Sequence, residues 1–151
     1  MEKLVIQSSI DNLVDVESFV TAVCDSFNIN NYAATISMSL IQAVTNAIVH
    51  GNKNDAKKQV VVVSDRCKGG IFFSVSDQGE GFDYSCFGSM PEKEERGTGL
   101  YIMNSLADKL SFSNNGSTVR LDFVINGIEA SRALERVMTI RNYYATRTVN
   151  A

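Results

Sequence analysis

The chain has 151 residues, of which 44% are apolar and 21% are charged, and its formal net charge at pH 7 is -3. This length supplies one sizeable hydrophobic core and leaves no room for two full domains. The negative charge gives no electrostatic reason to expect a nucleic acid or a membrane surface as a partner, because both attract basic proteins.

The N-terminal residues and the cysteines bear on the compartment. Residues 1–19 place charges among their apolar positions, so they contain neither a signal peptide nor a membrane-spanning run of about 18 residues. The expected location is therefore the cytoplasm. The cysteines, Cys24, Cys67 and Cys86, lack the close pairing of a zinc site, and we expect reduced thiols. His50 is the only histidine that could serve a catalytic cysteine as a base.

The first elements in chain order are a strand and a helix. Leu4 and Ile6 alternate with their neighbours in the manner of a strand. Ser9 or Asp11 could cap the helix that follows, which reaches about Phe27.

The most regular pattern runs from Tyr32 to about Gly51. Apolar residues recur there at helical spacing, and Gly51 is a natural helix stop. The recurring apolar residues are Ile36, Leu40, Ala43, Val44, Ala47 and Ile48. The pattern predicts a long helix with one apolar face.

Two hairpins are predicted in the rest of the chain. Val60–Asp65 and Ile71–Asp77 are rich in β-branched and aromatic residues and are joined through a Lys-Gly-Gly turn. Residues 110–112 and 118–124 form the second hairpin, around the turn sequence Asn114–Gly116.

The stretch from Gly79 to Gly99 separates the two hairpins. It is rich in glycine and contains the only proline and the charge cluster of residues 92–96. This composition is typical of a long loop that is functional or disordered. A helix from about Gly99 to Ala107 is predicted to follow it.

The order of these elements indicates the fold class. It predicts an α+β domain over residues 1–126, with helices on one face of a mixed, mainly antiparallel sheet. Residues 127–151 predict a helical C-terminal extension. Its apolar positions are Leu134, Val137, Met138 and Tyr144, and its arginines include Arg132, Arg136 and Arg141. Those arginines either dock an acidic partner or form a solvated helix face.

Three polar residues in the predicted central helix are spaced four apart, namely Gln42, Asn46 and His50. Their side chains therefore rise along one stripe beside the apolar face. Taken alone, such a stripe is more often a solvated helix face than a binding site. Two later segments favour a binding site.

The first of these segments is Asp77–Gly81, which places a carboxylate at the end of a buried strand. The two glycines after it let the backbone approach a ligand closely. An ionised carboxylate only accepts hydrogen bonds, and the exocyclic amine of adenine is a matching donor. In isolation, such a strand end is more often a plain turn.

The second segment is Arg96–Leu100, which ends the long loop and opens a helix. The first amides of a helix are unpaired and its dipole favours an anion, so phosphate is the natural ligand. Gly97 and Gly99 leave room for that approach. Thr98 can donate a hydroxyl and Arg96 a charge-assisted pair. The alternative is a glycine-rich helix entry with a surface arginine.

In this order and spacing, the segments resemble the N, G1 and G2 boxes of the GHKL ATPases. That family includes gyrase-type ATPases, histidine-kinase catalytic domains and anti-sigma-factor kinases. The resemblance covers about residues 4–124, and residues 43–51 and 96–103 look most like the anti-sigma-factor serine kinases. It implies the two-layer GHKL (Bergerat) sandwich, with ATP and Mg²⁺ as cofactors.

The resemblance also implies roles for the matching residues. Asn46 would coordinate the Mg²⁺ that bridges the phosphates, and Asp77 would read the adenine amine. Arg96 would reach the terminal phosphate or the protein substrate, and Ser117 stands where a Gly-Thr pair supports the adenine-binding aspartate. The other nucleotide-binding positions implied are His50, Gly79, Gly81, Phe82, Gly97, Thr98, Gly99 and Leu100.

The sequence departs from the family pattern at Gln42. The resemblance implies a glutamate there, which accepts the proton of the attacking hydroxyl. An amide can orient a nucleophile but cannot take its proton. Losing a general base costs about 10²- to 10⁴-fold in rate, although phosphoryl transfer relies mainly on positioning and electrostatic stabilisation. Gln42 and Arg96 are the candidate catalytic residues.

Two functions are compatible with the resemblance. The first is a serine/threonine protein kinase that binds a sigma factor and phosphorylates a STAS-type anti-sigma-factor antagonist. The second is a nucleotide-dependent module that sequesters a partner without phosphorylating it, because Gln42 leaves ATP uncleaved. A homodimer is a further expectation of the resemblance. A histidine kinase is disfavoured because the only histidine, His50, lies in the nucleotide-site helix.

Overall fold

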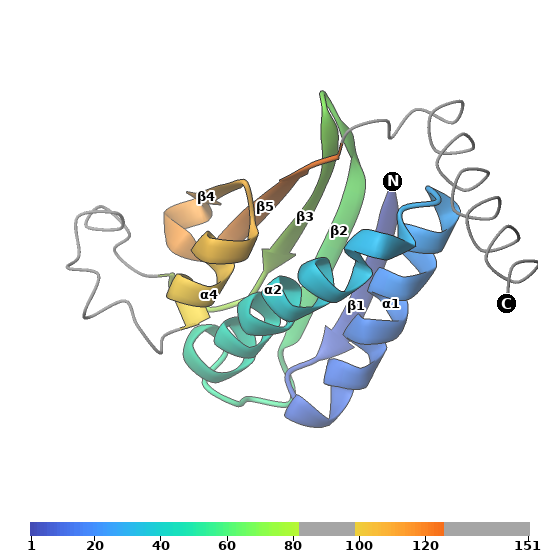
Figure 1. Ribbon diagram of the computed structural model, residues 1–151. Coiled ribbons are helices and arrows are strands. Elements are labelled where there is room, and N and C mark those ends of the chain that lie inside the picture. The colour runs from blue at the N-terminus through green and yellow to red at the C-terminus, as the bar shows by residue number, and fades with distance from the viewer. Residues whose placement is uncertain (82–98, 126–151) are drawn as a thin grey trace, which may run out of the picture.

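The computed structural model of the chain describes residues 1–81 and 99–125. These residues form a five-stranded sheet with helices packed against it (Figure 1). The strands are β1 (Glu2–Gln7), β2 (Gln59–Cys67), β3 (Gly70–Ser76), β4 (Lys109–Ser113) and β5 (Thr118–Val124). The α-helices are α1 (Leu13–Ser26), α2 (Ala33–Asn46) and α4 (Gly99–Leu106), and a π-helical turn, Ala47–Gly51, continues α2.

The sheet has the order β1-β2-β3-β5-β4, and the predicted α+β fold is confirmed. The expected mixed sheet differs in one detail, since all four pairings of the described strands are antiparallel. The strands β3 and β4 do run parallel to each other, since each is antiparallel to β5. However, β5 returns between them and pairs with both, because a tight hairpin must be antiparallel.

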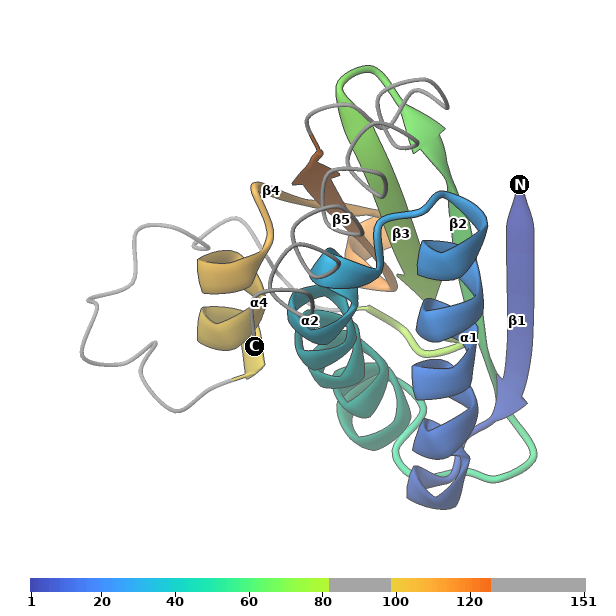
Figure 2. The same cartoon turned by 45° about the vertical axis from the view of Figure 1, so that its right-hand side comes forward.

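The three α-helices cover one face of the sheet, and Figure 2 shows α4, α2 and α1 side by side along it. Every second residue of a strand points toward that face, as Ile71, Phe73 and Val75 do in β3. Phe73 is fully buried and meets Phe19 of α1 edge to face, with ring centroids 6.2 Å apart. The hydrophobic core therefore lies between the sheet and the helical layer.

The opposite face of the sheet carries no helix among the residues that the structure describes. On it, Arg120 forms an ion pair with Asp122 at 2.8 Å, and its guanidinium carbon lies 3.9 Å from the centroid of the Phe72 ring. The Cys67 thiol donates a weak hydrogen bond to Asp122 at 3.8 Å. Burial and the Asp122 charge raise the pKa of the Cys67 thiol, which favours the neutral form.

The central helix α2 has the buried apolar face that its sequence predicts, including Ile36, Leu40 and Val44. By length and composition alone, the helical stretch Asn30–Gly51 is long and apolar enough to cross a membrane. One face of this stretch, including Ile36, Leu40, Val44 and Ile48, is nevertheless buried in the core with residues of the sheet and of α1, which is the arrangement of a core helix.

The element boundaries lie close to those predicted. Ser9 accepts a hydrogen bond from the Asp11 amide at 3.4 Å and caps a short 3₁₀ turn, Ile10–Asn12, that leads into α1. The N-cap residue of α1 itself is Asn12, whose side chain makes no cap hydrogen bond, so the predicted cap at Ser9 lies one turn earlier than the α-helix. The second hairpin turns at Asn114–Gly116 as expected. The proposed domain limit at residue 126 and the predicted helix over 127–151 lie outside the described residues.

Candidate functional site

A cavity of about 300 Å³ lies between α2, α4 and the strands β3, β4 and β5. Its volume falls at the lower end of the range for small-molecule pockets. The lining residues are Ala43, Asn46, Ala47, His50, Gly51, Val75, Asp77, Gly81, Met103, Phe112, Gly116, Ser117 and Val119. Five of the predicted nucleotide-binding residues are among them, since Asn46, His50, Asp77, Gly81 and Ser117 all line this cavity.

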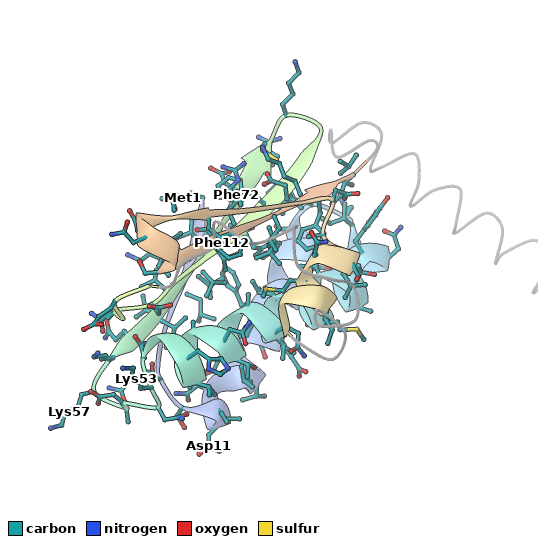
Figure 3. The ribbon with its side chains drawn as sticks, turned by 90° about the vertical axis from the view of Figure 1, so that its left-hand side faces the viewer. Met1, Asp11, Lys53, Lys57, Phe72 and Phe112 are labelled. Atoms are coloured by element: carbon teal, nitrogen blue, oxygen red, sulfur yellow. The ribbon has the colours of Figure 1, made fainter. Side chains whose placement is uncertain are left out.

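The walls of the cavity are mostly apolar. Val75 of β3, Met103 of α4 and Phe112 of β4 form part of them. Phe112 and Phe72, both labelled in Figure 3, lie on opposite faces of the sheet, and Phe112 is on the helix side. Asp77 provides the only carboxylate in the lining formed by the described residues. This chemistry suits a flat apolar ring that carries a hydrogen-bond donor on its edge.

The helix α2 and the π-helical turn that continues it provide one wall through two small residues and two polar ones. Ala43 and Ala47 are buried, Asn46 is half-buried, and His50 is exposed at the rim. Gln42 lies one helical turn before Asn46, is half-buried, and does not line the cavity. The structure therefore brings Asn46 and His50 together and places Gln42 outside the cavity.

A π-helical turn ends this helix. The Asn52 amide donates to the Ala47 carbonyl, five residues earlier, at 2.8 Å. Such turns widen the helix locally and are frequent at functional sites. Apolar periodicity does not distinguish one π-turn from an α-turn, so the sequence pattern did not reveal it.

Asp77 lies where the end of β3 meets this π-turn. Its amide donates to the Ser117 carbonyl at 2.9 Å, and its Oδ1 accepts from the Gly79 amide at 2.8 Å. The carboxylate packs against Gly51 so closely that a Cβ on Gly51 would overlap it. Backbone contacts on both sides therefore fix the direction of the carboxylate.

Burial raises the pKa of the Asp77 carboxyl above its ordinary value. The hydrogen bond from the Gly79 amide and the positive charge of Lys58 oppose part of this rise. An ionised carboxylate in an apolar cavity is costly unless a donor faces it. A ligand that brings such a donor is therefore favoured at this position.

The loop between β4 and β5 supplies Ser117. Its residues Asn114–Gly116 have positive φ angles of 51°, 58° and 91°. The Ser117 hydroxyl donates to the Asn114 carbonyl at 2.8 Å, within the loop. Ser117 thus supports Asp77 through its backbone carbonyl rather than through its side chain.

Two glycines that follow Asp77 have different surroundings. Gly81 lines the cavity with φ of 84°, and a Cβ there would overlap the Asn115 carbonyl. Gly79 does not line the cavity, but a Cβ there would overlap the Gly51 carbonyl. Both positions require glycine because backbone from another segment lies against them.

Sequence reasoning missed Asn52, which is fully buried. Its Nδ2 donates to Ser8 Oγ at 2.5 Å and to the Gln59 carbonyl at 3.0 Å, and its Oδ1 accepts from the Gln78 amide at 2.8 Å. An asparagine just after a helix stop looks like a turn residue, so only the structure reveals these partners.

Several predicted site residues cannot be placed in this way. Phe82, Arg96, Gly97 and Thr98 lie outside the described residues. Gly99 and Leu100 are the first residues of α4, as the sequence predicts. Their assignment to a phosphate site stays a prediction.

Comparison with known protein families agrees with this geometry. The family model of the histidine kinase-like ATPase domain matches residues 6–123, which include the three α-helices, the cavity lining, and the sheet apart from most of β1 and the last residue of β5. The chain belongs to the histidine kinase-like ATPases. Within that family it matches the anti-sigma-factor kinase subgroup, which confirms the resemblance seen in the sequence.

The relatives in this subgroup are moderately similar. An anti-sigma F factor of Clostridium perfringens is 32% identical over 93 residues, which are 56% of this chain and 66% of the relative. An anti-sigma F factor of Anoxybacillus flavithermus is 34% identical over 103 residues, or 62% and 68% of the two chains. The serine-protein kinase RsbW of Bacillus velezensis is 29% identical over 119 residues, or 72% of each. The chain spans 58% to 66% of its Clostridium perfringens relatives.

The residues present fit the nucleotide that membership of this ATPase family implies. The apolar walls and the Asp77 acceptor suit an adenine ring. The Asn46 side chain offers an amide oxygen, a hard ligand of the type that Mg²⁺ takes. Among the described residues there is no group of three or more His, Cys, Asp or Glu that would hold a metal alone.

Proposed function

We propose that the chain is an ATP-binding serine/threonine protein kinase of the anti-sigma-factor type. It binds a sigma factor and transfers the terminal phosphoryl group of ATP to a serine or threonine of a STAS-type antagonist. The observation that carries this proposal is the Asp77 carboxylate, held by backbone contacts at the edge of an apolar cavity. The proposal includes a cytoplasmic location and a homodimer.

The proposed binding roles rest on the family resemblance, and the cavity lining supports those of Asp77, Asn46 and His50. Asp77 accepts a hydrogen bond from the adenine amine, and the ring lies between the apolar walls. Asn46 offers its amide oxygen to Mg²⁺, and His50 lies at the rim on the same helix. When bound, Mg²⁺ neutralises phosphate charge. Residues 96–100 supply the amides and the guanidinium for the phosphates.

In the proposed transfer, the substrate hydroxyl oxygen forms a bond to the terminal phosphorus, and the bond to the bridging oxygen of ADP breaks. The Gln42 amide accepts a hydrogen bond from the hydroxyl and orients it. It cannot take the proton, which passes to a phosphate oxygen or to water. Transfer is then slower than with a glutamate, by about 10²- to 10⁴-fold.

A second function is compatible with the same site. Gln42 lies outside the cavity and has no carboxylate to act as a base, so a nucleotide could be held without being cleaved. In that case the chain is a nucleotide-dependent module that sequesters its partner.

An assay with labelled ATP separates these functions. The natural chain, Gln42→Glu and the exposed control Gln7→Glu are each incubated with a candidate STAS-type antagonist, and ATP binding is measured in parallel. We expect transfer by the natural chain and faster transfer by Gln42→Glu, with Gln7→Glu unchanged. Transfer by Gln42→Glu alone supports the sequestering module. Absence of ATP binding in all three chains would contradict both functions.

A further inference from the structure

Asn52 joins three segments of the chain next to Asp77. Its side chain donates to Ser8, after β1, and to Gln59, at the start of β2. It accepts from the amide of Gln78, the residue directly after Asp77. Asn52 is 0% exposed, so these partners replace water for every polar atom of the amide.

The hydrogen bond to Gln78 is half of a clamp on Asp77. On one side the Asp77 amide donates to the Ser117 carbonyl at 2.9 Å. On the other side the Gln78 amide donates to Asn52 at 2.8 Å. The two peptide groups that flank the Asp77 Cα are thus held by two different segments of the chain.

Asn52 also couples this clamp to the helix. Its own amide donates to the Ala47 carbonyl and closes the π-turn, and it directly follows Gly51, against which the Asp77 carboxylate packs. A further bond ties two partners of Asn52 to each other, since the Gln59 amide donates to Gln78 Oε1 at 2.6 Å. One buried residue therefore sets the spacing between the helix end and the strand end.

We propose that Asn52 is a positioning residue that aims the Asp77 carboxylate at the ligand and so determines selectivity for the adenine amine. This inference rests on the proposed function, because it assumes that Asp77 faces a nucleobase. Asn52 itself does not line the cavity. Asn52 acts through the backbone of Gln78. Its loss therefore moves the Asp77 carboxylate but does not remove it.

The test compares ATP with purine riboside triphosphate, which keeps the ring and the phosphates but lacks the exocyclic amine. For the natural chain we expect ATP to bind about 10- to 100-fold more tightly, the range for a hydrogen bond to a charged group. In Asn52→Leu and in the smaller, polar Asn52→Ser, neither side chain reaches the Gln78 amide. We expect their preference for ATP to fall to less than about threefold.

Two variants of the same network serve as controls. Asn52→Asp keeps an oxygen that accepts from the Gln78 amide, and Ser8→Ala removes a partner of Asn52 but leaves that bond intact. Both lower stability, and both are expected to keep the preference for ATP. The positioning role would be overturned if Asn52→Ser kept the preference for ATP over purine riboside triphosphate. It would also be overturned if Ser8→Ala lost that preference to the same extent as Asn52→Ser.

A measurement without ligand separates this inference from the proposed function. Amide hydrogen exchange in the free protein should be at least about tenfold faster at Gln78 in Asn52→Ser than in the natural chain. The amide of Ile125, which donates to Gly69 at the far end of β3, should not change. If the natural chain does not bind ATP, the proposed function fails, and unchanged exchange at Gln78 would overturn the clamp as well.

Discussion

The Asp77 carboxyl combines two requirements that oppose each other. It must be ionised to act as an acceptor only, yet its burial raises its pKa and disfavours the ionised form. The Gly79 amide compensates for part of this cost. The rest of the burial cost lowers the stability of the folded protein until a ligand donates a hydrogen bond to the carboxylate. The Asp77 carboxylate therefore weakens the fold at neutral pH and strengthens ligand binding.

The first prediction concerns Asp77→Asn. The amide still accepts from Gly79 and has no charge to bury, so the free energy of unfolding at pH 7 should not fall. The affinity for ATP should fall by about 10- to 100-fold, because a charged acceptor is lost. Calorimetric titration and chemical denaturation measure the two effects. An affinity equal to that of the natural chain would contradict the role of Asp77.

The pH dependence of the same residue follows from the direction of its pKa shift. The pKa of the Asp77 carboxyl is higher in the folded protein than in the unfolded chain. Its destabilising effect is therefore fully present above the folded pKa and disappears as the pH falls from the folded to the unfolded value. Over that interval ATP binding is lost as Asp77 is protonated, while the Asp77 contribution to stability improves. Comparison with Asp77→Asn, which lacks this titration, isolates the contribution.

Among the elements, the contact between the π-turn and the end of β3 decides the shape of the site. The helix end and the strand end approach so closely that Gly51 and Gly79 each face atoms of the other segment. No sequence pattern marks this approach in advance. Glycine is common at the end of a helix because it adopts conformations that other residues avoid. Gly51 is required for a different reason, because a side chain there would occupy the space of the Asp77 carboxylate.

The second prediction therefore concerns Gly51→Ala. The added methyl group overlaps the Asp77 carboxylate and should cost about 1–3 kcal/mol of stability, as overpacked sites do. Because the carboxylate must move, ATP affinity should fall together with the stability. Thermal denaturation and titration with ATP measure both.

A matched control is Gly69→Asn in the β2–β3 turn. Gly69 has φ of 81°, which asparagine tolerates, and a Cβ there meets no atom within 4 Å. ATP affinity should be unchanged in this variant. If Gly51→Ala binds ATP as well as Gly69→Asn does, the helix end is not a rigid wall of the site.

For the molecule as a whole, the helical layer and the sheet enclose one core, and the reactivity of the Cys24 thiol measures how tightly that core is packed. Cys24 of α1 is fully buried, and burial raises the pKa of its thiol to about 11. Both effects suppress the reactive thiolate. The thiol should therefore react only when the helical layer separates from the sheet, which is an opening of the core itself.

The third prediction is a labelling rate. In a background with Cys67→Ser and Cys86→Ser, iodoacetamide should modify Cys24 very slowly at pH 8, and urea should raise the rate in proportion to the unfolded fraction. A variant that keeps only Cys67, which is half-buried at the outer face, is the control and should react faster. Rapid labelling of Cys24 without denaturant would contradict a tightly packed core.

The sequence by itself determined the order of the elements and the residue types of the site. Apolar spacing located α2, β2 and β3, because local periodicity reflects which face is buried. It also singled out Asn46 and Asp77, since a strand-end carboxylate and a polar stripe are local features. In the structure both residues line one cavity, and their roles toward a nucleotide stay predictions.

Only the tertiary structure decided how that cavity is built. It placed Gln42 outside the lining, and it revealed that Ser117 acts through its carbonyl and Asn52 through the Gln78 amide. These contacts join residues up to tens of positions apart and involve backbone atoms that every residue type carries. The pattern of side chains along the sequence does not predict these contacts. A backbone hydrogen bond depends on where two segments meet and not on which residues they contain.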